Sequence, residues 1–224
     1  YFVKSAMRLS SLFSSLIAVL IVISLENYRN NSQEFIHLNS SWMNWEGQVF
    51  NNPLKLTKKH KSIYEKNLKN QIDQQVLYYK TGLNKNYHSK LSELIVYESK
   101  KYGYDPLLLT AVIITESSFN NYARSSKGAL GLMQIRPSTG KYLASKINVE
   151  WNGSSSLYDP ETNIILGAYY LNKLFIDFGD LGLALEAYNH GPSRLKRYLK
   201  KGYRPKLYSQ KVFKKYNGLI YPSI

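Results

Sequence analysis

A long apolar segment in the middle of the chain reads Pro106-Leu-Leu-Leu-Thr-Ala-Val-Ile-Ile-Thr-Glu-Ser-Ser-Phe119, and its only acidic residue is Glu116. Asp105 stands directly before Pro106, as an N-cap residue stands before a proline in the first helical position. The segment therefore predicts a largely buried helix that ends near Glu116. Burial disfavours the charged form of a carboxyl group and raises its pKa, so Glu116 is a candidate general acid. On this segment alone, a helix-end glutamate that faces water is the alternative.

Helical patterns continue on both sides of this segment, and no alternating strand pattern of any length accompanies them. Asp159-Pro160-Glu161 repeats the capping pattern of Asp105-Pro106 and opens another apolar helix. Further helices are predicted over residues 58–80, before 101, from 137, over 181–189 and over 193–200. We therefore predict a mainly α fold.

An uncharged apolar run of 17 residues lies near the N-terminus, from Leu9 to Leu25, without glycine or proline. As a helix it is about 25 Å long, slightly shorter than the hydrocarbon core of about 30 Å. Lys4 and Arg8 precede the run, which predicts a cytoplasmic N-terminus and export of the residues that follow. A cleaved signal peptide remains an alternative, but no small-residue cleavage site follows Leu25. We favour an uncleaved single-pass anchor.

These patterns divide the chain into four expected parts. Residues 1–25 are the membrane segment, and residues 26–86 form a linker or partly helical stalk. The stalk contains an amphipathic helix that we expect to pack on the domain rather than to lie on a membrane. Residues 87–205 form the main helical domain, and residues 206–224 form a basic C-terminal tail.

The chain carries a net charge of +15, and ten of its basic residues lie between Arg194 and Lys215 with no acid among them. Such a field attracts nucleic acid, anionic lipid or an acidic wall polymer, and it does not select one of them. A solvated tail that keeps the protein soluble is the alternative. No recognition-helix or RNA-binding motif accompanies the charge, and the export signal argues against a nucleic-acid partner.

Cysteine is absent from the 224 residues, which excludes disulfides, thiolate metal sites and a cysteine nucleophile. His190 has no second histidine at metal-ligand spacing. We therefore expect no metal and no cofactor.

Six short blocks carry a resemblance to a known family, in this order: Glu116-Ser-Ser-Phe119, Ser125-Ser-Lys-Gly-Ala129, Gly131-Leu-Met-Gln134, Asp159-Pro-Glu-Thr-Asn-Ile164, Gly167-Ala-Tyr-Tyr-Leu171 and Ala187-Tyr-Asn189 with Gly191-Pro192. Together they resemble the soluble lytic transglycosylase (SLT) catalytic domain, over roughly residues 89–205. Each block is weak evidence alone, and six in the right order are strong. The resemblance implies a lysozyme-like, goose-type helical fold and an enzyme that cleaves peptidoglycan.

The resemblance also implies roles for individual residues. Glu116 would be the single catalytic acid and base, which cleaves the MurNAc-β-1,4-GlcNAc bond and forms a 1,6-anhydromuramoyl product. The substrate-binding candidates are Ser117, Ser125, Met133, Gln134, Tyr188 and Asn189. Tyr188 matches a position whose hydroxyl reaches the catalytic glutamate or the sugar N-acetyl group. The sequence leaves open whether Ser117 and Asn189 touch substrate or cap a helix locally, and it places Met133 half in the core and half at the substrate.

The expected location is the cell envelope, with a single-pass cytoplasmic-membrane segment and the catalytic domain in the periplasm or wall space. Peptidoglycan strands are the expected partner, with envelope-spanning machinery as a further partner class. Two alternatives remain from the same residues. One is a lysozyme-type muramidase that uses water, and the other is a wall-binding or secretion-assembly scaffold that has lost catalysis.

Overall fold

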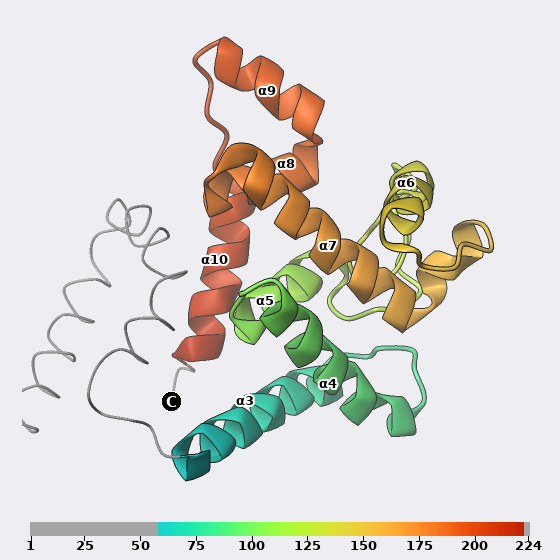
Figure 1. The fold of residues 1–224 in the computed structure, drawn as a ribbon, viewed down its shortest axis with the longest axis vertical. Helices are drawn as coiled ribbons and strands as arrows, with labels where there is room; N and C mark the ends of the chain where they lie inside the picture. The colour runs from blue at the N-terminus through green and yellow to red at the C-terminus, as the bar shows by residue number, and fades with distance from the viewer. Residues whose placement is uncertain (1–57, 222–224) are drawn as a thin grey trace, which may run out of the picture. The chain divides into compact units, whose positions relative to one another are not determined.

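The computed structural model describes the backbone of residues 58–221 and the side chains of residues 65–221. Its helices, labelled as in Figure 1, are α3 (Lys58–Tyr78), α4 (Lys85–Lys101), α5 (Pro106–Ser117), α6 (Pro137–Ile147), the short 3-10 helix η1 (Ser154–Tyr158), α7 (Pro160–Phe178), α8 (Leu181–His190), α9 (Pro192–Lys200) and α10 (Leu207–Ile220). Within these residues, β-structure is limited to isolated bridges in the loop between α5 and α6. The predicted mainly α class is confirmed for this part of the chain.

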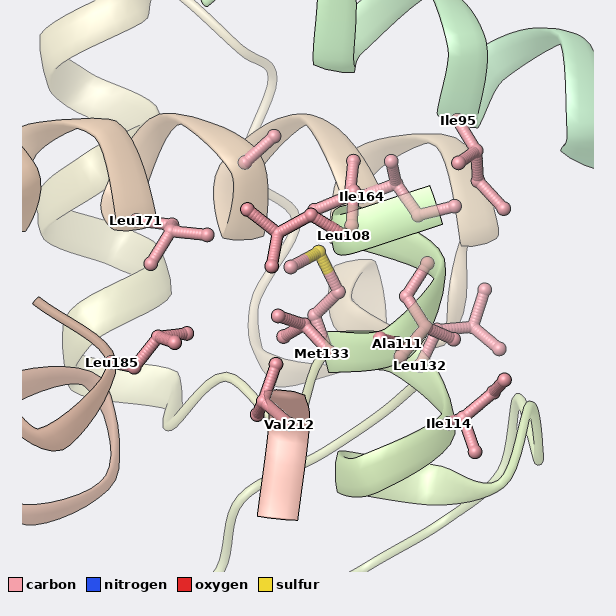
Figure 2. Close-up of a cluster of buried hydrophobic side chains, with 14 of the residues drawn as sticks. Ile95, Leu108, Ala111, Ile114, Leu132, Met133, Ile164, Leu171, Leu185 and Val212 are labelled. Carbon is pink, nitrogen blue, oxygen red and sulfur yellow. The ribbon is translucent and has the colours of Figure 1, made fainter. Parts of the chain in front are cut away.

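Helix α5 lies at the centre of the domain and packs against α3, α4 and α10. All nine of its residues from Pro106 to Ile114 are buried, as the apolar segment predicts. Figure 2 shows the core around it, where side chains of α5 meet those of α4, α7, α8, α10 and the loop after α5: Ile95, Leu108, Ala111, Ile114, Leu132, Met133, Ile164, Leu171, Leu185 and Val212. The position of the helix that carries Glu116 is therefore set by packing from every side.

Two predicted N-caps define the main helices. The Asp105 carboxylate accepts a hydrogen bond of 2.8 Å from the backbone N–H of Leu107. The Asp159 carboxylate accepts one of the same length from the N–H of Thr162 at the start of α7. Each cap satisfies an N–H that has no partner within its own helix. Both predictions from the Asp-Pro pairs are confirmed.

The structure extends the packed domain beyond both predicted boundaries. Leu68, Ile72 and Val76 of α3 are buried in the core, which confirms the prediction that this amphipathic helix packs on the domain. The segment predicted to be a basic tail instead contains helix α10, whose Tyr208, Val212, Tyr216 and Leu219 are buried. These four residues share one helical face while the lysines of α10 point outward. The domain therefore does not end near residue 205.

Within residues 58–221, none of the helices combines the length and the apolar character needed to cross a membrane. The predicted membrane segment from Leu9 to Leu25 lies outside the described residues.

Candidate active site

Glu116 lies in the last turn of α5, where the chain leaves the helix abruptly. Ser118 and Phe119 both adopt positive φ angles, 50° and 58°, and the Phe119 side chain returns into the core. The Glu116 carboxyl group is half-buried. Burial raises its pKa to about 7, and a hydrogen bond from Tyr208 opposes part of that rise. Near neutral pH the group can therefore both give and take a proton.

Tyr208 makes the one side-chain hydrogen bond to Glu116 that the described residues show. It is the second residue of α10, it is buried, and its hydroxyl group donates to Glu116 Oε1. Burial and the negative charge of Glu116 raise the pKa of Tyr208 well above its usual value. Tyr208 therefore stays protonated and acts as a hydrogen-bond donor.

The Asn163 side chain of α7 fixes the loop between α5 and α6 through hydrogen bonds. The Asn163 amide nitrogen donates to the carbonyl oxygens of Leu130 and Leu157, at 3.0 and 2.8 Å. Its amide oxygen accepts from the Met133 N–H at 2.7 Å. Gly131 packs against Asn163 so closely, at a φ of 78°, that a β-carbon there would overlap the Asn163 amide. Close packing within the protein therefore explains why a glycine occupies this position.

The predicted residues of this loop mainly hold its shape. The Ser125 hydroxyl oxygen accepts from the Ala129 N–H at 2.9 Å. Gln134 has a φ of 51°, and its side-chain nitrogen donates to the carbonyl oxygens of Ala123 and Gly131 at 3.1 and 2.9 Å. Both side chains remain half-buried. The turn is thus built around two of the predicted binding residues.

Met133 differs from its prediction. Its side chain is fully buried and lies against Gly167 of α7, so it is a core residue rather than part of a substrate surface. The backbone of Met133 has a role of its own, because its carbonyl oxygen accepts a 2.8 Å hydrogen bond from the Tyr188 hydroxyl. A methionine between two predicted binding residues is ambiguous in sequence, since its flexible side chain suits a core gap as well as a surface.

Burial and the charge of nearby Glu116 raise the pKa of Tyr188 well above its usual value. Its hydroxyl group points to the Met133 carbonyl oxygen rather than to the carboxylate. The Ser117 hydroxyl donates to the Ile113 carbonyl oxygen at 3.2 Å, within its own helix. Asn189 is exposed at the end of α8. The structure thus gathers Glu116, Tyr188 and the Gly131–Gln134 turn, and it leaves Asn189 open to solvent.

The sequence that forms this site matches the model of a known protein family. Residues 93–210 match the family model described as the transglycosylase SLT domain, which is more than half of the 224 residues. The chain belongs to this family. The matched range includes Tyr208 and most of the helices described above.

Three proteins show how similar this chain is to known transglycosylases. The chain is 38% identical over 128 residues to a protein named "Transglycosylase" from Enterobacteria phage PRD1, which is 57% of this chain and 43% of the phage protein. It is 37% identical over 92 residues to membrane-bound lytic murein transglycosylase E of Buchnera aphidicola, 40% of this chain and 42% of that one. An inactive mutant of the lytic transglycosylase Slt from Pseudomonas aeruginosa superposes with a TM-score of 0.46 at 30% identity, over 57% of this chain and 22% of Slt. The chain spans less than half the length of these relatives.

The acids elsewhere in the SLT domain have structural partners. Asp105 accepts a 2.6 Å hydrogen bond from the Tyr216 hydroxyl in addition to capping α5. Glu161 is exposed and lies 3.9 Å from the Lys90 ammonium group. Burial also raises the pKa of Glu98, but the Lys101 ammonium group lies 3.4 Å from its carboxylate and opposes that rise. Among residues 65–221, no three histidine, aspartate or glutamate side chains gather at metal-binding distance.

Sequence reasoning missed two residues of this site, Tyr208 and Glu186. Tyr208 fell beyond the predicted domain end. Glu186 of α8 is almost completely buried, with 1% of its surface exposed, and it lies in the stretch Ala184-Leu-Glu-Ala-Tyr188. An acid flanked by apolar residues one helical turn before His190 was the available signal for Glu186. For Tyr208 the signal was its spacing of four and eight residues from Val212 and Tyr216.

Proposed function

We propose that this protein is a peptidoglycan lytic transglycosylase in which Glu116 is the single general acid and base. The observation that carries the proposal is a half-buried carboxyl group with a pKa of about 7 at the end of a fully packed helix. The protein belongs to the SLT family, and its relatives include lytic murein transglycosylases. Both findings support peptidoglycan as the substrate class.

In the first step, protonated Glu116 donates its proton to the glycosidic oxygen between MurNAc and GlcNAc. The bond from C1 of MurNAc to that oxygen breaks, and its electron pair stays on the departing oxygen. Tyr208 donates to Oε1, which leaves Oε2 to carry the proton. The same hydrogen bond stabilises the carboxylate that forms when the proton leaves.

In the second step, the Glu116 carboxylate takes the proton of the C6 hydroxyl group of the same muramic acid. The C6 oxygen forms a bond to C1 and closes the 1,6-anhydro ring, so no water is consumed. Glu116 ends the cycle protonated, ready for the next bond. A pKa of about 7 suits both steps, because a catalytic group works best when its pKa lies near the working pH.

This chemistry fits the other carboxylates of residues 65–221 near the main helices, which already have structural partners. Glycosidases that use two carboxylates hold them about 5–5.5 Å or about 6.5–9.5 Å apart, depending on the stereochemical outcome. Asp105, Asp159 and Glu98 are occupied by a helix cap or an ion pair. Glu186 is occupied by hydrogen bonds to Ser209. An internal hydroxyl nucleophile removes the need for another carboxylate.

Ser125, Gln134, Ser117, Tyr188 and Asn189 are proposed to bind the saccharide. For Gln134 the structure suggests which atom acts: the side-chain nitrogen holds the loop, and the side-chain oxygen has no hydrogen-bond partner among the described residues. That oxygen can accept from a sugar hydroxyl or amide group. We further propose that the enzyme works at the cell wall, with the run from Leu9 to Leu25 as a membrane anchor.

Mass spectrometry of the products tests the proposal. The 224-residue chain is incubated with purified peptidoglycan, and the released muropeptides are compared with those from a hydrolytic muramidase. Products lighter by one water molecule carry the 1,6-anhydro ring and support a transglycosylase. Reducing-end muramic acid would instead identify a hydrolase, and binding without release would identify a scaffold.

A further inference from the structure

Glu186 is a buried carboxylate for which the proposed reaction has no use. It lies on α8, and its Oε1 accepts hydrogen bonds from both the backbone N–H and the hydroxyl group of Ser209, at 2.8 and 2.9 Å. Ser209 is the third residue of α10. The carboxylate of one helix therefore holds the first turn of another.

The first turn of α10 has no local cap. Lys206 occupies the N-cap position, and its side chain makes no capping hydrogen bond. The first N–H groups of a helix lack partners within the helix, and the helix dipole favours a negative charge beside them. Glu186 supplies both the acceptor and the charge from a distant part of the sequence.

Tyr208 lies directly before Ser209 in this turn. Its hydroxyl group donates to Glu116 Oε1, so the contacts run from Glu186 through Ser209 and Tyr208 to Glu116. These contacts join α8, α10 and α5, and α10 packs against both of the other two helices. We propose that Glu186 is a positioning residue, which holds the first turn of α10 so that Tyr208 donates to the catalytic carboxyl group.

His190 completes the arrangement. Its Nε2 lies 3.4 Å from Glu186 Oε2, one helical turn along α8. Oε2 is buried and has no hydrogen bond to any residue that the structure describes, and within this part of the chain His190 is the one basic side chain within ion-pair distance of it. The carboxylate is thus turned with Oε1 toward Ser209 and Oε2 toward the imidazole. The catalytic part of this inference rests on the proposed function of Glu116, and the positioning part does not.

The test measures the titration of Glu116 directly. Carbon-13 NMR of carboxyl-labelled glutamate follows each side chain across pH, and the Glu116→Gln variant assigns the Glu116 signal. The groups that face Glu116 are Tyr208 and Tyr188. In Glu186→Ala, loss of the Tyr208 hydrogen bond is expected to raise the Glu116 titration midpoint by about one pH unit.

The sign of the shift separates positioning from simple electrostatics. Removing a buried negative charge would by itself favour the charged form of a nearby carboxyl group and lower its midpoint. An upward shift therefore reports release of Tyr208. A downward shift or no shift in a folded Glu186→Ala variant overturns the proposal.

Three further variants sharpen the test. Glu186→Gln keeps an acceptor oxygen for Ser209, so its Glu116 midpoint is expected to stay close to that of the wild type. Asp159→Ala removes the cap of α7, which is expected to lower the melting temperature without moving the midpoint. The double variant Glu186→Ala/Tyr208→Phe is expected to show no more shift than Tyr208→Phe, and an additive shift would contradict a shared route.

Two controls keep the result interpretable. Because the His190 imidazole lies 3.4 Å from Glu186, the titration of Glu116 is repeated in His190→Gln. If Glu186→Ala does not fold, Ser209→Ala removes one of the two hydrogen bonds to Oε1 and is expected to give a smaller upward shift, whereas an unchanged midpoint would count against the proposal. Failure of the wild-type chain to release anhydro products would refute the proposed function while leaving this titration to decide the positioning role.

Discussion

Helices α5 and α10 lie side by side in opposite directions, and they contribute to the site in different ways. Asp105 at the start of α5 meets Tyr216 near the end of α10, and Glu116 at the end of α5 meets Tyr208 at the start of α10. Helix α5 is buried over nine consecutive residues, whereas α10 buries one face and exposes its lysines. The proposed catalytic group comes from the buried helix, and its hydrogen-bond donor comes from the helix with an exposed face.

This difference separates two contributions to the chemistry. The burial of α5 raises the pKa of Glu116, and the donor from α10 lowers it again. The first effect depends on the packing of a whole core, while the second depends on one hydroxyl group. The two effects can therefore be removed independently.

Glu116→Gln is expected to have the largest effect, because it removes the only proposed proton donor. Release of muropeptides should fall by at least about a hundredfold, since general acid–base groups typically contribute about 10²–10⁴ in rate. Glutamine has nearly the same shape, so the fold and the binding to wall sacculi should persist. Residual cleavage within tenfold of the wild type would rule out the assigned role.

The same variant should also reveal the energetic cost of burying a carboxyl group. Its pKa is raised from 4.5 to about 7 in the folded protein, so the native state holds the proton more tightly than the unfolded chain does. Stability from this group is fully present below pH 4.5 and is lost as the pH rises through about 7. Glu116→Gln has no such loss, so its melting temperature should rise relative to the wild type between these pH values. A constant difference across that window would contradict a raised pKa.

Tyr208→Phe tests the contribution of α10 alone. Loss of the donor removes the one side-chain hydrogen bond to Glu116 found among residues 65–221, so the pKa of Glu116 should rise. The general acid then stays protonated to higher pH, and the alkaline limb of the activity profile should move upward by about one unit. Tyr216→Phe is the matched control, because it removes the hydrogen bond to Asp105 at the far end of the same helix. The control should lower stability without moving the limb, and an equal shift in both variants would mean that α10 acts only through its general packing.

Neutralising basic residues on the surface between Arg194 and Lys215 should have the smallest effect of these changes. All ten basic residues between Arg194 and Lys215 are exposed, and none forms an ion pair with another described residue. We expect pelleting with purified sacculi to weaken steeply between low and moderate salt, because screening shortens the reach of exposed charges. Neutralising Lys200, Lys201 and Lys206 should reduce this salt dependence more than neutralising the exposed Lys80, Lys85 and Lys141. A flat salt response would argue that the basic surface is merely solvated.

Helices α5 and α10 also differ in how well their local sequence predicts their structure. The largely apolar sequence of α5 and its Asp-Pro start are local signals, and they predict the helix, its burial and its end near Glu116. Helix α10 carries its apolar residues on a single face among lysines. Because the lysines outnumber any clear local helix signal, the segment is predicted from sequence as a basic tail. Met133 is a second residue that local sequence does not assign correctly. Its position beside Gln134 predicts a substrate contact, whereas its side chain is buried in the core.

The sequence alone therefore determines α5 and α7, their Asp105 and Asp159 caps and the one acid placed at the end of an apolar helix, because these depend on residues close together in sequence. The tertiary structure decides which groups reach that acid. Tyr208 lies 92 residues from Glu116, and Glu186 lies 23 residues from Ser209, so neither contact leaves a local pattern. The pKa of Glu116 likewise depends on burial by several helices at once, and only the packed domain provides it.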